Sequence, residues 1–207
     1  MYNTRSVTKD ITMSCKQSPH RNSKTKTTVR GGIIEAPPVH SSKYPIFKDG
    51  WNLYYHDADN KNWDLGSYTL ILNDIRDPEQ LISINETIPE NIVKNAMLFV
   101  MRNNIQPIWE DEKNRHGGYL SFRIPNKTVF HNWKSIFYGL CGETLFKEDS
   151  VNSKINGISI SPKKTFCIIK LWMSSCDCKD AELNPILHLN TTDTKFTPFS
   201  ETDAVTA

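Results

Sequence analysis

The sequence predicts a single α+β domain over residues 44–207, because short strand-like runs are interspersed with stretches typical of helices. A hydrophobic content of 38%, with five Trp, seven Tyr and nine Phe, is enough for one sizeable core. The chain has no apolar run of about 18 residues, and its first residues lack the apolar stretch of a secretory signal. We therefore expect a cytoplasmic protein with no membrane span.

Residues 1–43 form a basic segment that precedes this domain. Eight basic and two acidic side chains give it a net charge of +6, which leaves −4 for the rest of the chain. Its polar composition cannot bury enough apolar surface to offset the entropy lost on ordering, so we expect a disordered spacer in preference to a specific RNA-binding arm. The acidic remainder argues against a surface that coats nucleic acid broadly.

The first expected elements are strands over residues 51–56 and 68–72, separated by turn-prone residues. Asp77-Pro78-Glu79 predicts the start of a short helix at the surface, with the proline in its first turn. Residues 95–100 and 118–124 are expected strands on either side of a charged loop, residues 107–117.

Residues 129–142 are the strongest predicted helix, since four apolar residues form one stripe at helical spacing: Trp133, Ile136, Phe137 and Leu140. Residues 157–161 and 165–172 predict a hairpin with lysines at its tip. Beyond residue 172 we expect a brief helix at 178–183, a short strand at 186–189 and a mobile end, so that 173–207 is shortened and partly mobile.

The five cysteines are an odd and scattered set, and without a secretion signal they are interpreted as reduced thiols. Cys176 and Cys178 lie one residue apart, but no second Cys or His pair stands at the spacing of a zinc site. We expect neither a metal nor a cofactor.

Two tryptophans lie on polar loops, where packing in the core is a weak explanation for them. Trp63 follows the turn at residues 57–62, and Trp109 precedes three acids. Two indole rings can hold a cationic base by stacking and cation–π attraction. The carboxylate of Glu110 can accept the N1–H and N2–H donors of guanine, although on its own it would be interpreted as an exposed acid.

The loop sequence resembles the cap-binding loop of the eukaryotic translation initiation factor 4E family, since it reads IQPIWEDEKN over residues 105–114 and is followed by Gly117-Gly118. Further matching residues extend the resemblance from Tyr44 to Trp172. It implies a curved antiparallel sheet backed on its convex face by helices, with 7-methylguanosine bound in the concave face. Trp63 and Trp109 would then stack on the base, Glu110 would bind its edge and Trp172 would contact the methyl group.

The expected phosphate contacts depart from the family pattern. The family's arginine falls on Lys163, the next phosphate-binding lysine falls on Ile168, and Tyr119 replaces a basic residue. The triphosphate would then be bound by Lys163 and Lys164 at the hairpin tip, or by Lys170 and Arg123. Alternation places Lys170 on the same face as Trp172, and Arg123 on the same face as Tyr119. A lysine-rich site predicts looser and more salt-sensitive binding.

The expected partner surface also departs from the pattern. Family members dock a peptide of the 4G scaffold on a tryptophan of the first helix, where this sequence has Ile82. The positions that the resemblance assigns to this surface are Pro45, Pro78, Ile82, Trp133, Lys134 and Tyr138. We expect capped mRNA and a 4G-type scaffold, or a divergent equivalent, as partners. The shortened end suggests a compact or virus-like variant.

Three alternatives differ in function. A cap-binding repressor would bind the cap without recruiting the scaffold. An enzyme would use Glu110 and Glu112 as an acid–base pair, but no nucleophile or metal supports them, so no catalytic residue is expected. A plain scaffold domain would bury all its aromatic residues in the core.

Overall fold

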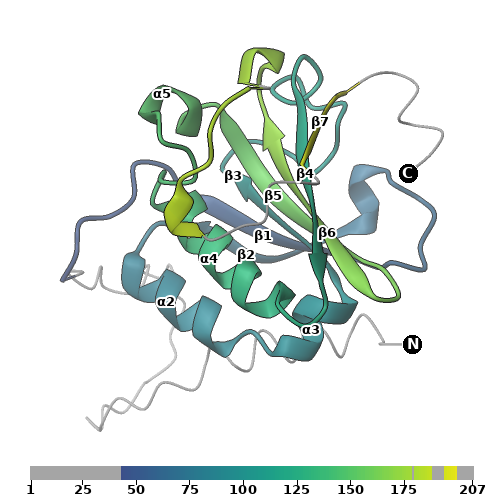
Figure 1. The fold of residues 1–207 in the computed structure, drawn as a ribbon. Helices are drawn as coiled ribbons and strands as arrows, with labels where there is room; N and C mark the ends of the chain where they lie inside the picture. The colour runs from purple at the N-terminus through teal and green to yellow at the C-terminus, as the bar shows by residue number, and fades with distance from the viewer. Residues whose placement is uncertain (1–42, 179, 188–193, 200–207) are drawn as a thin grey trace, which may run out of the picture.

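The computed structural model describes residues 43–178, 180–187 and 194–199. One antiparallel sheet with the strand order β2-β1-β3-β5-β6-β4-β7 confirms the predicted α+β class (Figure 1). Its strands are β1 (Trp51–His56), β2 (Tyr68–Ile75), β3 (Met97–Arg102), β4 (Gly118–Pro125), β5 (Ile155–Pro162), β6 (Phe166–Met173) and β7 (Lys195–Pro198). The predicted disordered tail lies outside the described residues, apart from Lys43.

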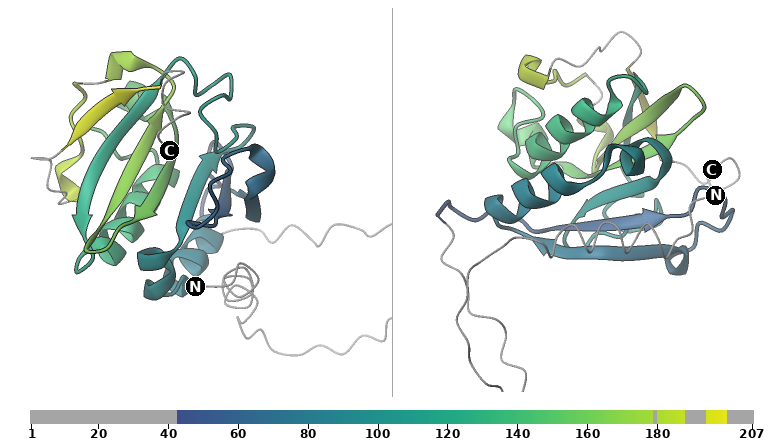
Figure 2. Two further views of the ribbon diagram at one scale, coloured as in Figure 1. Left: turned by 90° about the vertical axis from the view of Figure 1, so that its right-hand side faces the viewer. Right: turned by 90° about the horizontal axis from the view of Figure 1, so that it is seen from below.

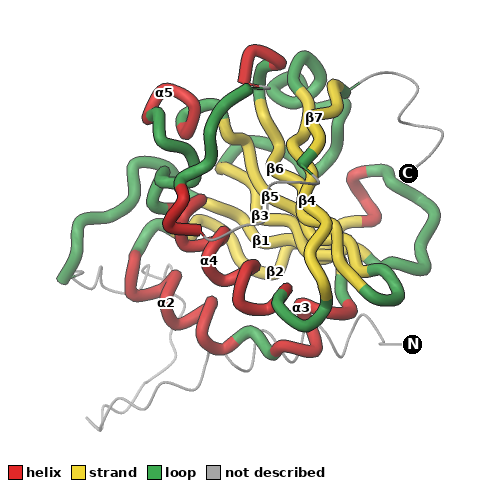
Figure 3. The backbone as a smooth tube through the Cα atoms, viewed as in Figure 1, coloured by secondary structure: helices red, strands yellow, loops and turns green. Residues whose placement is uncertain are grey.

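The helices α2, α3 and α4 lie against one face of the curved sheet, and the opposite face is concave (Figures 2 and 3). The helices are α2 (Pro78–Thr87), α3 (Glu90–Asn95), α4 (Val129–Cys141) and α5 (Asp149–Asn152), with single 3-10 turns η1 (Leu65–Ser67), η2 (Cys176–Cys178) and η3 (Pro185–Leu187). None of the described helices is long and apolar enough to span a bilayer.

The two predicted helices are explained by local chemistry at the start of α2 and by the apolar stripe of α4. The Asp77 carboxylate accepts a hydrogen bond from the Glu79 backbone N–H at 2.8 Å, and Pro78 occupies the first turn of α2. The apolar stripe of α4 lies fully against the sheet: Trp133, Ile136, Phe137 and Leu140 are at most 1% exposed. Burial of this stripe therefore fixes α4 on the convex face.

Alternation along the strands divides the apolar side chains between the two faces of the sheet. The convex-face core combines helix residues with Leu53, Leu98, Val100 and Ile158, among others. A second group, which we call the concave-face cluster, faces away from the helices and consists of Tyr54, Met97, Phe99, Met101, Ile105 and Trp172. The concave face therefore carries its own apolar surface, which positions the candidate site.

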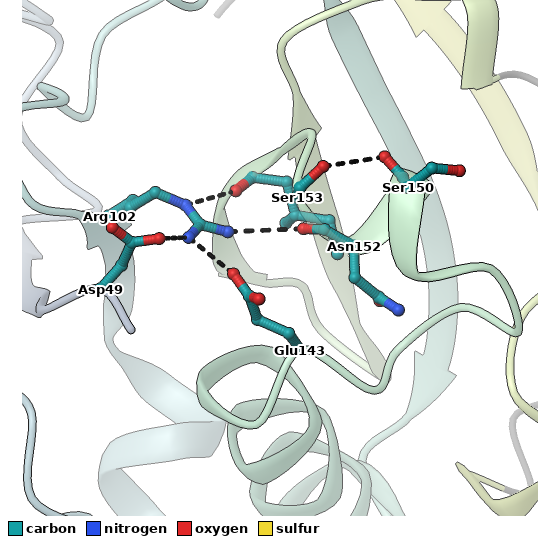
Figure 4. Close-up of polar contacts among 7 residues, drawn as sticks. Asp49, Arg102, Glu143, Ser150, Asn152 and Ser153 are labelled. Carbon is teal, nitrogen blue, oxygen red and sulfur yellow. Dashed lines mark hydrogen bonds and ion pairs between the residues drawn. The ribbon is translucent and has the colours of Figure 1, made fainter. Parts of the chain in front are cut away.

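Arg102, at the end of β3, connects several segments that are distant in sequence (Figure 4). Its guanidinium pairs with the carboxylates of Asp49 and Glu143, the latter at 2.8 Å. It also donates to the carbonyl oxygens of Ile155 at 3.1 Å and Asn152 at 3.4 Å, and it lies over the Trp51 ring. The segment before β1, the end of α4 and the start of β5 are thus held together by one side chain.

The structure corrects the predictions for the C-terminal region. The expected helix at 178–183 is replaced by η2, and Leu183 instead forms an isolated bridge with Phe146. Of the expected strand at 186–189, residues 186 and 187 are described, and they belong to the turn η3. Residues 195–198 of the expected mobile end form β7, which pairs with β4. These short elements are set by contacts with distant segments, which local patterns do not encode.

Candidate functional site

Trp63 lies at the concave-face cluster, in the segment between β1 and η1. It is half-buried, and its indole ring stacks on the imidazole of His56 with 4.2 Å between ring centroids and an interplanar angle of 2°. His56 is fully buried as the last residue of β1. One face of the Trp63 ring is therefore occupied by protein.

Tyr68 packs between this stack and Phe99 of the concave-face cluster. Its ring lies 4.8 Å from the His56 ring and packs edge-on against Phe99 at 5.2 Å. Burial, and to a lesser extent the negative charge of Glu110, raise the pKa of Tyr68 well above its ordinary value. The Glu110 carboxylate thus lies within electrostatic range of a ring that belongs to the Trp63 end of the site.

The loop between β3 and β4 is held in place by the side chains of Asp111 and Asn114. The Asp111 carboxylate accepts hydrogen bonds from the backbone N–H groups of Gln106 and Lys113, both at 2.9 Å. The fully buried Asn114 amide donates to the carbonyl oxygens of Gln106 at 3.0 Å and Ile108 at 2.7 Å. Trp109 and Glu110 lie between these anchored positions.

Asn156 fastens the same loop to the sheet. Its amide, on β5, donates to the Lys113 carbonyl at 2.7 Å and to the Asn114 side-chain oxygen at 2.9 Å. At the end of the loop, a Cβ on Gly117 would lie only 1.8 Å from the Met173 carbonyl oxygen, so this position requires glycine. The loop is therefore a fixed structure that presents the side chains at its tip.

Trp109 is half-buried and Glu110 is exposed at this tip. Among the described residues, the Trp109 ring makes no contact with another aromatic ring, and Glu110 forms no ion pair. Within the described part of the chain, neither side chain is therefore committed to a ring stack or to an ion pair.

Trp172 lies in a continuous row of rings on the concave face. It packs against Phe99 at 6.2 Å and against Phe199 at 5.1 Å, and its indole N–H donates to the Ser159 hydroxyl at 3.0 Å. Only 7% of its surface is exposed. Through Phe99 and Tyr68 this row reaches the His56–Trp63 stack, so the structure connects Trp63 and Trp172 along one surface.

Two of the predicted basic residues, Lys170 and Arg123, lie on the same side of the sheet as Trp172. The register pairs Tyr119 with Trp172, Ser121 with Lys170 and Arg123 with Ile168, which confirms the alternation argument. The Lys170 ammonium lies 4.0 Å from the Tyr119 ring centroid. The Arg123 guanidinium lies 4.1 Å from the ring of Phe166, which brings it beside the hairpin tip that carries the exposed Lys163 and Lys164.

The predicted partner surface lies on the helical face, with one exception. Ile82 is 48% exposed on α2, whereas Trp133 is fully buried beneath α4 and cannot contact a partner directly. Trp133 was wrongly placed on this surface, because it belongs to the apolar stripe of α4. Lys134 and Tyr138 both contact Glu86 of α2, at 2.6 Å and 2.9 Å. Pro45 is exposed, and Pro78 occupies the first turn of α2.

Several residues of the site were not identified from the sequence: His56, Tyr68, Asn114, Asn156 and Phe199. A lone buried polar residue in a strand gives no local signal of its partner. The aspartate and asparagine of the loop could have been flagged, because such side chains often bind nearby backbone N–H groups. In the described part of the chain the four cysteines are free, and no cluster of ligating side chains could hold a metal.

Comparisons with known proteins place this chain beside members of one family. A family model described as eukaryotic initiation factor 4E matches residues 46–201. Eukaryotic translation initiation factor 4E of Candida glabrata is 29% identical over 140 residues, which are 65% of this chain and 65% of that relative. The homolog of Acanthamoeba polyphaga mimivirus is 39% identical over 62 residues, which are 30% of this chain and 23% of the relative. The match thus spans less than two thirds of either relative's length.

A solved structure shows the same fold. C. elegans eIF4E-3, in a complex with the 4E-binding protein Mextli and cap analog, superimposes with a TM-score of 0.64 at 17% identity. The superposition covers 79% of this chain and 96% of that one. At this level of identity the likeness concerns the fold.

Proposed function

Because this chain belongs to the eukaryotic initiation factor 4E family, we propose that it binds the 7-methylguanosine cap of mRNA and acts in translation initiation. The observation that carries the proposal is the arrangement of Trp63, whose inner face is covered by His56, with the anchored loop that presents Trp109 and Glu110. The C. elegans relative bound to a cap analog supports the choice of ligand. The proposed role is binding without turnover.

The base is held between Trp63 and Trp109 in this proposal. Stacking of a base on an aromatic side chain contributes about 1–3 kcal/mol, and a cationic ring adds about 2 kcal/mol where water is excluded. The positive charge of the methylated base makes both contributions available, whereas an unmethylated guanine provides only the first. Selectivity for the methylated base therefore follows from the indole rings.

Glu110 reads the edge of the base. Its two carboxylate oxygens match the two N–H donors of guanine, and a base without these donors would leave the carboxylate unpaired. Trp172 forms the floor of the site, where its small exposed edge contacts the methyl group. Arg123, Lys163, Lys164 and Lys170 bind the triphosphate.

The proposal is tested by tryptophan fluorescence quenching with 7-methyl-GTP and with GTP. We expect much tighter binding of the methylated nucleotide, and loss of this preference in Trp63→Ala and in Trp109→Ala. Leu65→Ala is the matched control, since Leu65 is an exposed apolar residue two positions from Trp63. Equal affinities of the unmodified chain for the two nucleotides would exclude cap recognition.

A second candidate function is cap binding that represses or sequesters messages. Glu86 holds Lys134 and Tyr138 on the helical face, where a 4G-type scaffold is expected to dock, and Ile82 stands where the family has tryptophan. Both features weaken docking of a standard scaffold peptide. A pull-down on cap resin separates the two functions, because recovery of a scaffold protein supports initiation and contradicts sequestration.

A further inference from the structure

His56 is a buried polar side chain that the proposed sandwich does not use. Its ring is fully buried and parallel to the Trp63 indole at 4.2 Å. Its Nε2 atom lies 2.9 Å from the carbonyl oxygen of Asn62, the residue that precedes Trp63. Because a carbonyl only accepts hydrogen bonds, Nε2 carries the hydrogen.

The remaining nitrogen of His56, Nδ1, is buried and has no hydrogen-bond partner among the described residues. The ring is therefore held through its Nε2 atom, which binds the backbone next to Trp63, and through its face, which stacks on the Trp63 indole.

These two contacts restrain Trp63 in different ways. The stack fixes the plane of the indole, and the hydrogen bond fixes the backbone from which the side chain leaves. Tyr68 supports the imidazole from β2 at 4.8 Å, so the histidine ring is itself held. Preorganisation of this kind improves binding because less rotational freedom is lost when the ligand arrives.

We propose that His56 is the positioning residue of Trp63: it covers the inner face of the indole and fixes its plane, so that the outer face alone is offered to the methylated base. This inference rests on the proposed function. It assigns His56 a part in selectivity, because attraction between a cationic base and an indole depends on the orientation of the ring face more than simple hydrophobic contact does.

The test compares variants at position 56 that differ in shape and hydrogen bonding. His56→Phe keeps a flat ring and loses the hydrogen bond, whereas His56→Leu fills the space without a flat ring. We expect affinity for 7-methyl-GTP to fall about threefold in His56→Phe, and tenfold or more in His56→Leu and His56→Ala. In a Trp63→Ala background, a further His56→Ala change should have no effect.

The decisive measurement is the ratio of affinities for 7-methyl-GTP and GTP, with thermal melting of each variant. A lost positioning residue lowers this ratio, whereas general loosening of the fold lowers both affinities together. His131→Ala, at an exposed histidine on α4, is the control and should leave the ratio unchanged.

Each outcome decides the inference. If the unmodified chain prefers 7-methyl-GTP and His56→Leu shows the same ratio of affinities, the role of His56 is overturned and the proposed function is left intact. An unmodified chain without selectivity overturns both. If His56→Ala fails to fold, the ratios of affinities of His56→Phe and His56→Leu are compared instead. This comparison tests the inference when the two variants melt at the same temperature.

Discussion

Asn114 illustrates how a single buried side chain shapes the site. An amide has two donors and an acceptor, and in Asn114 all three are used, by Gln106, Ile108 and Asn156. Such complete pairing makes a buried polar group stabilising, since an unpaired one costs about 1–3 kcal/mol. These hydrogen bonds come from the protein itself, so they fix the loop segment that presents Trp109 and Glu110.

At Glu110 we expect the substitution Glu110→Gln to raise the Kd for 7-methyl-GTP about 10- to 100-fold. The amide keeps the shape of the side chain but replaces one acceptor oxygen with a donor, and a hydrogen bond to a charged group contributes about 1.5–3 kcal/mol. Fluorescence titration measures the change. Glu112→Gln, at an exposed acid of the same loop, should stay within about twofold of the unmodified chain. Similar losses in both variants would show that only overall charge matters.

Sequence could identify the partly or fully exposed loop residues of the candidate site better than the buried ones. Trp63, Trp109 and Glu110 stand out because large aromatic residues are unusual on charged loops. His56 and Asn156 act through partners that the chain folding brings to them, so their neighbours in sequence do not reveal their contacts. Trp172 was assigned to the site only through the family resemblance, and its contact with Phe199, which comes 27 positions later, has no local signal in the sequence.

The pair of helices α2 and α4 is joined by a small polar network. Hydrogen bonds from Lys134 and Tyr138 to the Glu86 carboxylate hold its pKa below the ordinary value. Burial, together with the hydrogen bond to Glu86, raises the pKa of Tyr138 to about 12. The ion pair is therefore complete at neutral pH and connects the two helices on the helical face.

The pH dependence of this network can be predicted. A carboxylate whose pKa is depressed by folding stabilises the protein above its unfolded pKa of about 4.3, and this contribution is lost as the pH falls through the folded pKa. Glu86→Gln should therefore melt slightly below the unmodified chain at pH 7, and the gap should close at an acid pH below the folded pKa of Glu86. Because Glu86 is largely exposed, the gap at pH 7 should be small. A gap of the same size at both pH values would contradict the account, and Glu112→Gln serves as control.

Longer elements could be predicted more reliably than short ones. The stripe of α4 repeats over two turns, and the β5–β6 hairpin pairs neighbouring segments, so local patterns determine both. By contrast, α3 and β7 have six and four residues, too few for a clear period. They form because they pack on α4 and pair with β4, respectively.

At the scale of the whole molecule, Arg102 joins parts of the chain that local structure leaves separate. Its side chain is only 12% exposed, and the guanidinium donates to two carboxylates and two carbonyl oxygens. We expect Arg102→Ala to lower the free energy of unfolding by about 2–4 kcal/mol, since charged hydrogen bonds and packing on Trp51 are lost together.

Urea denaturation measures this change. Arg76→Ala removes an ion pair whose two side chains are 44% and 51% exposed, and it should cost at most about 1 kcal/mol. An equal effect of the two substitutions would show that the contacts of Arg102 add nothing beyond a surface charge pair.

Strand β7 has a consequence for any shortened form of the protein. It pairs with the first half of β4, from Gly118 to Ser121. If the chain were cut before Lys195, the backbone N–H and C=O groups of that half would lose their described neighbour, and an open row of such groups readily recruits a strand from another molecule. A fragment trimmed at its C-terminus would then be prone to self-association, even with every residue of the loops still in place.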